Sequence, residues 1–167
     1  IYTLVGGVVE ELVIQDSILQ SQDPSVEALS LSAGVVTLQR VTVLGTLSVH
    51  RLWASETLID GAAQVFDTQN GCFRFSAAAE AGSRLPKPYE PCWLAAGTKL
   101  FTSRRFGNPG FCQLGEAAPE GLKRGAENGS EIGAFCRLLN PIKMDSLRAK
   151  VNEFMPFGLI PLFIHQT

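Results

Sequence analysis

The sequence lacks the features that mark several protein classes. It has no run of about 18 apolar residues, so we expect no membrane-spanning helix. Its most apolar stretch, Phe154 to Ile164, is short and is interrupted by Pro156, Gly158 and Pro161. The N-terminus has no basic region, so no secretory signal is indicated, and the start at Ile indicates a piece of a longer chain or a processed product.

Charge is also scarce. Only 18% of the 167 residues are charged, and the net charge is −2. A nucleic-acid surface is normally basic, so this balance argues against one. Because 46% of the residues are hydrophobic, an extended tail or linker is excluded as well, and the length fits one domain or two small ones.

Residues that bind metals or carry out nucleophilic chemistry are few and scattered. His50 and His165 have no acidic or cysteine neighbour at ligand spacing, so a metal-dependent enzyme would require the fold to bring such ligands to them. Cysteines occur at positions 72, 92, 112 and 136 without a C-x-x-C pair, which excludes a zinc ribbon or thioredoxin motif. We expect reduced thiols, and a Cys72–Cys92 disulfide is the less favoured alternative. No metal or other cofactor is predicted.

The two halves of the chain differ in charge and texture. Residues 1–76 contain three basic and eight acidic side chains, whereas residues 77–167 contain eleven basic and eight acidic ones. β-branched and hydroxyl residues dominate the first part, and Gly, Pro, Arg and Phe the second. We therefore predict a boundary between Ala77 and Gly82, with one domain over residues 1–80, another over 81–167, and an extended loop over residues 82–91.

The first part contains short strand-like segments that resemble one another, at residues 16–19, 41–44, 56–59 and 71–74. Together with further strand-like fragments between them, these segments are three to six residues long and alternate apolar with polar side chains. The pattern predicts a mainly β fold: a short right-handed parallel β-helix of about three coils, closed by a mixed α+β C-terminal cap. Ser17, Thr42 and Thr57 would form a stacked hydroxyl column, which ordinary β-propensity explains better than a sugar-binding or ice-binding ladder.

The second part is predicted to cover the open end of the coil. Strands are expected at residues 99–103 and 111–114, followed by helical pieces broken at glycines. A stronger helix, capped by Asp145, would pack Leu147, Val151 and Phe154 against the core. Residues 159–164 would form a terminal strand or apolar tail. Helix and strand together would cover the exposed strand edge at the open end of the β-helix.

A polysaccharide-cleaving β-helix needs clustered carboxylates. The acidic residues of the first part are isolated in sequence, and only Asp16 and Glu56 are expected to stack across coils. This signal is weak, so a carbohydrate-binding or carbohydrate-cleaving domain is the alternative hypothesis.

Basic and aromatic residues occur together at two turns. They form the predicted interaction surface: Arg84, Lys87, Tyr89, Arg104, Arg105 and Phe106. Such groups can bind phosphates or a nucleic-acid strand, but a contact surface for a neighbouring subunit is the favoured interpretation.

Several strings in the chain look like one known group of proteins. They include residues 71–76, 82–92, 101–110, 125–135 and 147–159. These strings resemble the C-terminal region of large bacterial β-helix proteins associated with phage-tail-like contractile injection systems, over roughly residues 12–165. The chain departs from that pattern at Glu90, where a basic residue is expected, and at Cys136, where His is expected.

The resemblance implies a non-enzymatic structural or docking module of such a particle, with no catalytic residue to carry over. Its partners would be other protein subunits or preceding coils of a longer chain, or a glycan in the alternative hypothesis. The location would be the cytoplasm or a released particle.

Overall fold

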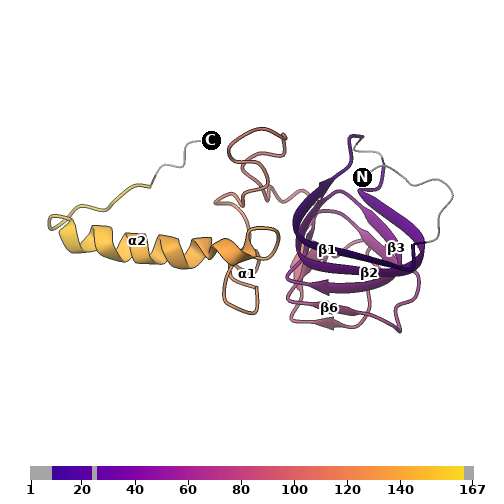
Figure 1. The fold of residues 1–167 in the computed structure, drawn as a ribbon. Coiled ribbons are helices and arrows are strands. Elements are labelled where there is room, and N and C mark those ends of the chain that lie inside the picture. Colours follow the sequence, from indigo (N-terminus) through magenta and orange to yellow (C-terminus); the bar gives the residue numbers. More distant parts are fainter. Residues whose placement is uncertain (1–8, 24–25, 164–167) are drawn as a thin grey trace.

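A computed structural model describes residues 9–23 and 26–163. Its main body is a parallel β-helix, drawn in indigo to magenta in Figure 1, which confirms the predicted fold class. The strands in chain order are β1 (Glu11–Gln20), β2 (Leu29–Leu44), β3 (Leu47–Ser55), β4 (Leu58–Ile59), β5 (Ala63–Val65), β6 (Cys72–Arg74), β7 (Ala77–Ala79), β8 (Pro88–Tyr89) and β9 (Cys92–Leu94).

The strands line three parallel walls of the coil. Wall A contains the first part of β1 and the middle of β2, followed by β3, β6 and β8. Wall B contains the ends of β1 and β2, followed by β4, β7 and β9. Wall C joins the start of β2 to the start of β3 and to β5. β1 and β2 are longer than predicted because each runs from one wall into the next without a break.

Walls A and B meet at a corner that repeats once per coil. The residue at each corner is not glycine yet has a positive φ angle, between 45° and 54°: Asp16, Arg40, Glu56, Phe75 and Glu90. This backbone region is unfavourable for such residues and persists only where the surroundings enforce it. Ladder bonds support it, because Phe75 N–H donates to the Tyr89 carbonyl at 3.0 Å. Five stacked corners mark four turns, one more than predicted.

The interior of the coil is a column of aliphatic side chains with one aromatic layer. Val36, Leu52 and Ile59 are fully buried in it, and so is Phe73. The ring of Trp93, on the last coil, stacks on Phe73 with 6.4 Å between centroids. Aromatic stacking therefore covers part of this end of the coil, where the sequence predicted a cap.

The register corrects the predicted hydroxyl column. Ser17 pairs with Val41, whereas Thr42 pairs with Ile18 and Leu58, so the three hydroxyl residues do not stack in one line. The first repeat therefore runs from Ser17 to Val41 and is one residue shorter than a column from Ser17 to Thr42 requires. A one-residue shift turns a side chain to the other face of a strand.

The boundary and the cap also differ from the prediction. The parallel ladder continues through β8 and β9 to Leu94, because the Pro-rich stretch 82–91, predicted as an extended loop, forms part of the last coil. Residues 95–139, here called the side layer, pack against the outer face of wall B, and a second apolar cluster joins Leu58 and Ala77 to Phe101 and Leu122. In place of the predicted strands 99–103 and 111–114 there are two isolated bridges, Phe101–Leu114 and Ser103–Phe111.

The C-terminal helix projects away from the body. Short helices occur in the side layer at α1 (Glu120–Lys123) and at a 3-10 turn, Cys136–Leu138, before α2 (Asn140–Phe154) begins. α2 starts with Pro141 in its first turn, so the predicted cap Asp145 lies inside it. Every residue of α2 is at least partly exposed, and Phe154 is 85% exposed. The predicted packing of Leu147, Val151 and Phe154 into the core is therefore wrong (Figure 1).

Residues 155–163, the tail, turn back from the tip of α2 without forming the predicted strand, and Ile164 and His165 lie outside the described residues. We call α2 and the tail together the arm. The helices in the described part of the chain are too short or too polar to cross a bilayer.

Candidate interaction surfaces

The first three predicted surface residues lie on the last coil. Arg84 forms ladder bonds with Ala63 and Val65 through its backbone, and its side chain is exposed. Lys87 is exposed beside β8, and the Tyr89 ring packs edge-on against Phe75 at 5.4 Å. These side chains belong to walls A and C, so they extend the surface of the coil.

The other three predicted residues lie on a side-layer turn near wall B. The Arg104 guanidinium forms an ion pair with the largely buried carboxylate of Asp60 and lies 5.9 Å from the centre of the Phe101 ring. Burial raises the pKa of Asp60, and the positive charge of Arg104 opposes that rise. Arg104 is thus an anchor for the side layer. Arg105 and Phe106 point outward, and Phe106 is 84% exposed. The structure keeps the two predicted triplets on separate elements.

The predicted pair of carboxylates, Asp16 and Glu56, shares a cation. The Arg40 guanidinium lies at the corner between Asp16, at 2.6 Å, and Glu56, at 4.0 Å. Arg137 of the side layer adds a second cation 3.5 Å from Asp16. The hydrogen bond from Arg40 holds the pKa of Asp16 below its usual value and raises the pKa of Arg40 itself. A general acid needs a proton near neutral pH, so this arrangement does not suit Asp16 for that role.

The backbone of the side layer comes especially close to wall B at Gly133. Gly133 N–H donates to the Glu56 carbonyl at 2.9 Å, and Ala134 N–H donates to the buried Thr42 hydroxyl at 3.0 Å. A Cβ at position 133 would lie 2.6 Å from the Thr42 Oγ1, and its φ of 122° also favours glycine. The absence of a side chain at Gly133 therefore allows the backbone of the side layer to contact wall B.

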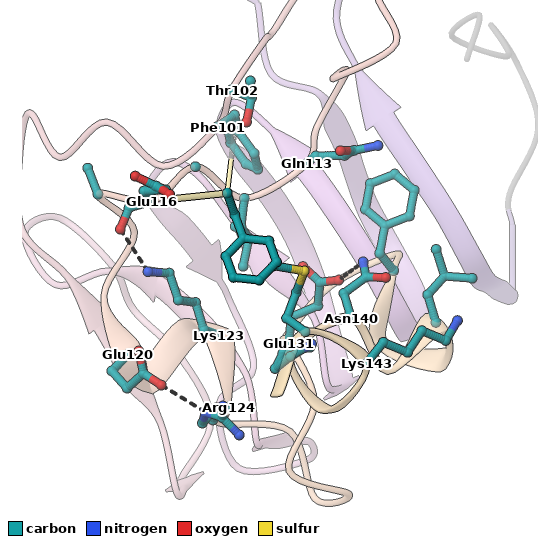
Figure 2. A pocket seen from close by; sticks show the side chains of 18 of the residues that line it. Phe101, Thr102, Gln113, Glu116, Glu120, Lys123, Arg124, Glu131, Asn140 and Lys143 are labelled. Carbon is teal, nitrogen blue, oxygen red and sulfur yellow. Dashed lines mark hydrogen bonds and ion pairs between the residues drawn. The ribbon is translucent and has the colours of Figure 1, made fainter. Parts of the chain in front are cut away.

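A groove of about 1020 Å³ opens between the side layer and the base of α2 (Figure 2). Its apolar surface comes from Phe101, Leu114, Phe135 and Met144, together with Phe163 of the tail. Clefts of this kind with a few polar groups are the usual binding sites of proteins. Sequence reasoning missed this groove, because its walls come from segments as far apart as residues 99 and 163.

One buried carboxyl lies in this groove. Glu131 is 6% exposed, and Asn140 Nδ2 donates to its Oε1 at 2.6 Å (Figure 2). Burial raises the pKa of Glu131, while the bond from Asn140 opposes the rise. On the rim, Lys123 donates to the Glu116 carbonyl, and Arg124 pairs with Glu120 and Asp145. The groove thus has an apolar floor, one buried polar point and a charged rim.

Burial affects three of the four thiols. All four cysteines are free, in line with the favoured prediction. Burial raises the pKa of Cys112 to about 12 and that of Cys136 to about 11, and it also raises that of Cys92. A thiolate is the reactive form, so these groups are poor nucleophiles. Within residues 9–23 and 26–163 no cluster of three His, Cys, Asp or Glu side chains can hold a metal ion, and His165 lies outside that part.

Comparisons with protein-family models, curated proteins and solved structures found no match to this chain.

Proposed function

We propose that this chain is a non-enzymatic structural module, which joins other protein subunits through its arm. The resemblance to β-helix proteins of phage-tail-like contractile injection systems supports an assembly or docking role in such a particle. On this proposal the protein works in the cytoplasm during assembly or in the released particle.

The arm is the observation that carries the proposal. Phe154 and the tail residues Phe157, Ile160 and Leu162 are between 84% and fully exposed. Exposed apolar clusters of this kind mark sites of interaction, because burial against a partner removes their surface from water. A projecting helix with a free apolar end is well placed to reach a neighbouring subunit.

The body of the molecule supports the same role. Its coil is a continuous parallel ladder around an aliphatic interior, and the corner carboxylates of Asp16 and Glu56 are held by Arg40. Rigid repeats of this kind present surfaces at fixed spacing, which suits a scaffold.

Photo-crosslinking in the assembled particle tests the proposal. A benzophenone amino acid replaces Phe157 in the tail, and a matched variant replaces Phe66, which is 57% exposed on the coil. The Phe157 probe is expected to give a discrete crosslink to a particle subunit, whereas the Phe66 probe gives a background signal. Equal background labelling from both positions would overturn the proposal.

A glycan-binding role remains the second candidate, and one observation favours it. The Trp53 indole is 49% exposed on the outer face of wall A, between Thr37 and Cys72 in the ladder and beside the column of Gln15, Gln39 and Ser55. An aromatic ring beside amides and hydroxyls can stack on a sugar and bond its hydroxyl groups. Affinity electrophoresis with Trp53→Ala, against Phe66→Ala, tests this: only the former should abolish retardation by a polysaccharide.

A further inference from the structure

The tail is uncharged and mostly apolar, yet little of it is covered. Residues 155–163 contain no charged side chain, and Phe157 and Ile160 are almost completely exposed. Removing such surface from water is favourable, in proportion to the apolar area that is buried. Most of the apolar surface of the tail is therefore in contact with water and can still be buried against a partner.

The end of the tail already touches the groove. The Phe163 ring lies 5.8 Å from the Arg148 guanidinium and forms part of the groove lining. Figure 1 shows the chain turning at the tip of α2 and running back beside the helix. Tail and groove on this one chain are thus chemically compatible.

Only the end of the tail reaches the groove. A turn at residues 156–159 takes up part of the nine residues of the tail, and Phe163 lies against Arg148, about halfway along the 15-residue helix α2. The other apolar side chains of the tail stay outside the groove. The groove, with a volume of about 1020 Å³, is larger than one phenyl ring needs.

We propose that the groove takes the tail of a second copy of this chain, and that the exchange is reciprocal, so that the protein forms a homodimer. This inference rests on the proposed function, because it names the partner of the arm. A tail that approaches from another copy does not have to return along α2, and it can place several apolar side chains on Phe101, Phe135 and Met144. Exchange of an identical element between protomers is a low-cost route to a dimer.

Charge is compatible with this occupant. The groove rim includes Lys99 and Lys143, and its buried polar group is the Glu131 carboxyl already bonded to Asn140. An uncharged tail enters without bringing a further charge next to the buried carboxyl, which would be costly. The turn at Gly158, with φ of 83° and open space around its Cβ position, gives the tail a point at which its direction can change.

Two variants and their mixture test the exchange. The tail variant is Phe157→Asp with Ile160→Asp, and the groove variant is Met144→Glu on α2, so neither alters a core residue. Sedimentation analysis over a concentration series should show a wild-type dimer, and each variant should associate at least about tenfold more weakly. Circular dichroism checks the fold, and Phe106→Asp is the control at another exposed aromatic.

Mixing the two variants distinguishes tail-in-groove binding from tail-to-tail packing. The groove variant keeps an intact tail and the tail variant keeps an intact groove, so the mixture should regain association through one good contact. Failure to regain it, or a wild type that stays monomeric, overturns the exchange. If the wild type is monomeric but the Phe157 probe still crosslinks to a different subunit, the exchange fails and the proposed function stands. If the probe also fails, both are wrong.

Discussion

The coil and the arm contain similar aromatic residues, but a phenylalanine that is buried in the coil has an exposed counterpart in the arm. Phe73 in the coil is fully buried, whereas Phe154 in the arm is 85% exposed. Phe73 lies in a strand that alternates its side chains between two faces, and Phe154 lies at helical spacing from Leu147 and Val151. The difference lies in neighbours: each strand of the coil has a strand above or below it, and α2 projects without such a layer. Periodicity therefore indicates which face of an element is apolar and leaves open what covers that face.

The largest expected effect sharpens this comparison directly. Phe73→Ala should destabilise the protein by about 3–5 kcal/mol, because it leaves a cavity between Trp93 and the aliphatic column. Phe154→Ala should change stability by less than about 0.5 kcal/mol in a dilute sample. Urea unfolding of both variants measures the difference. Equal losses of stability would mean that the arm is packed as tightly as the coil.

A second substitution probes the seam between the coil and the side layer. Gly133→Ala places a methyl group against Thr42 and should cost about 1–3 kcal/mol. The matched control is Gly129→Ala, which also has a positive φ but open space around its Cβ position. Hydrogen exchange of the Ile132 amide, which bonds the Leu122 carbonyl, should accelerate much more in the first variant. Equal acceleration would mean that backbone strain alone, and not the contact with wall B, determines the effect.

The corner charges should give a smaller, pH-dependent effect. Arg40→Met leaves Asp16 and Glu56 without their shared cation, at a cost of about 1–2 kcal/mol at pH 7, between the values for exposed and buried pairs. The native pKa of Asp16 is lowered, so the stabilisation exists above its unfolded pKa and is lost as the pH falls. The gap between wild type and variant should therefore narrow below about pH 4. The exposed Arg105→Met is the control, and a gap independent of pH would contradict this account.

The smallest effect is expected in the groove. Because burial raises the native pKa of Glu131, the protein loses stability as the pH rises from the unfolded pKa through the native one. Glu131→Gln keeps an acceptor for Asn140 and removes that loss, so it should stabilise the protein at pH 7 by up to about 1 kcal/mol. Urea midpoints at pH 4 and pH 7, with Glu116→Gln for comparison, measure this. A destabilised Gln variant at pH 7 would show that the ionised carboxylate is required.

Sequence reasoning predicted the coil because its evidence is local and repeated: short alternating segments that recur along residues 12–76. The register was shifted by one residue at Thr42, since the length of a repeat depends on the turns between strands, which vary. The extent of the coil was underestimated, because the prolines of residues 82–91 suggested an extended loop, although an edge strand tolerates proline.

The arm and the groove were harder to predict for different reasons. Leu147, Val151 and Phe154 have helical spacing, so the helix was predicted, but spacing cannot reveal that the face stays open. Glu131 has no local signal of burial, since its environment comes from residues near positions 101 and 140. The roles of Arg104 as an anchor and Arg40 as a shared cation arise from partners distant in sequence, such as Asp60 for Arg104.

The left-handed corners have a consequence for how the coil comes apart. Each corner residue keeps its unfavourable backbone only while the rungs on both sides hold it, so a rung that melts removes support from the next. Disorder should then spread from the two ends inward, in the manner of a nearest-neighbour chain, and amide protection should be highest around Glu56, the middle of the five corners.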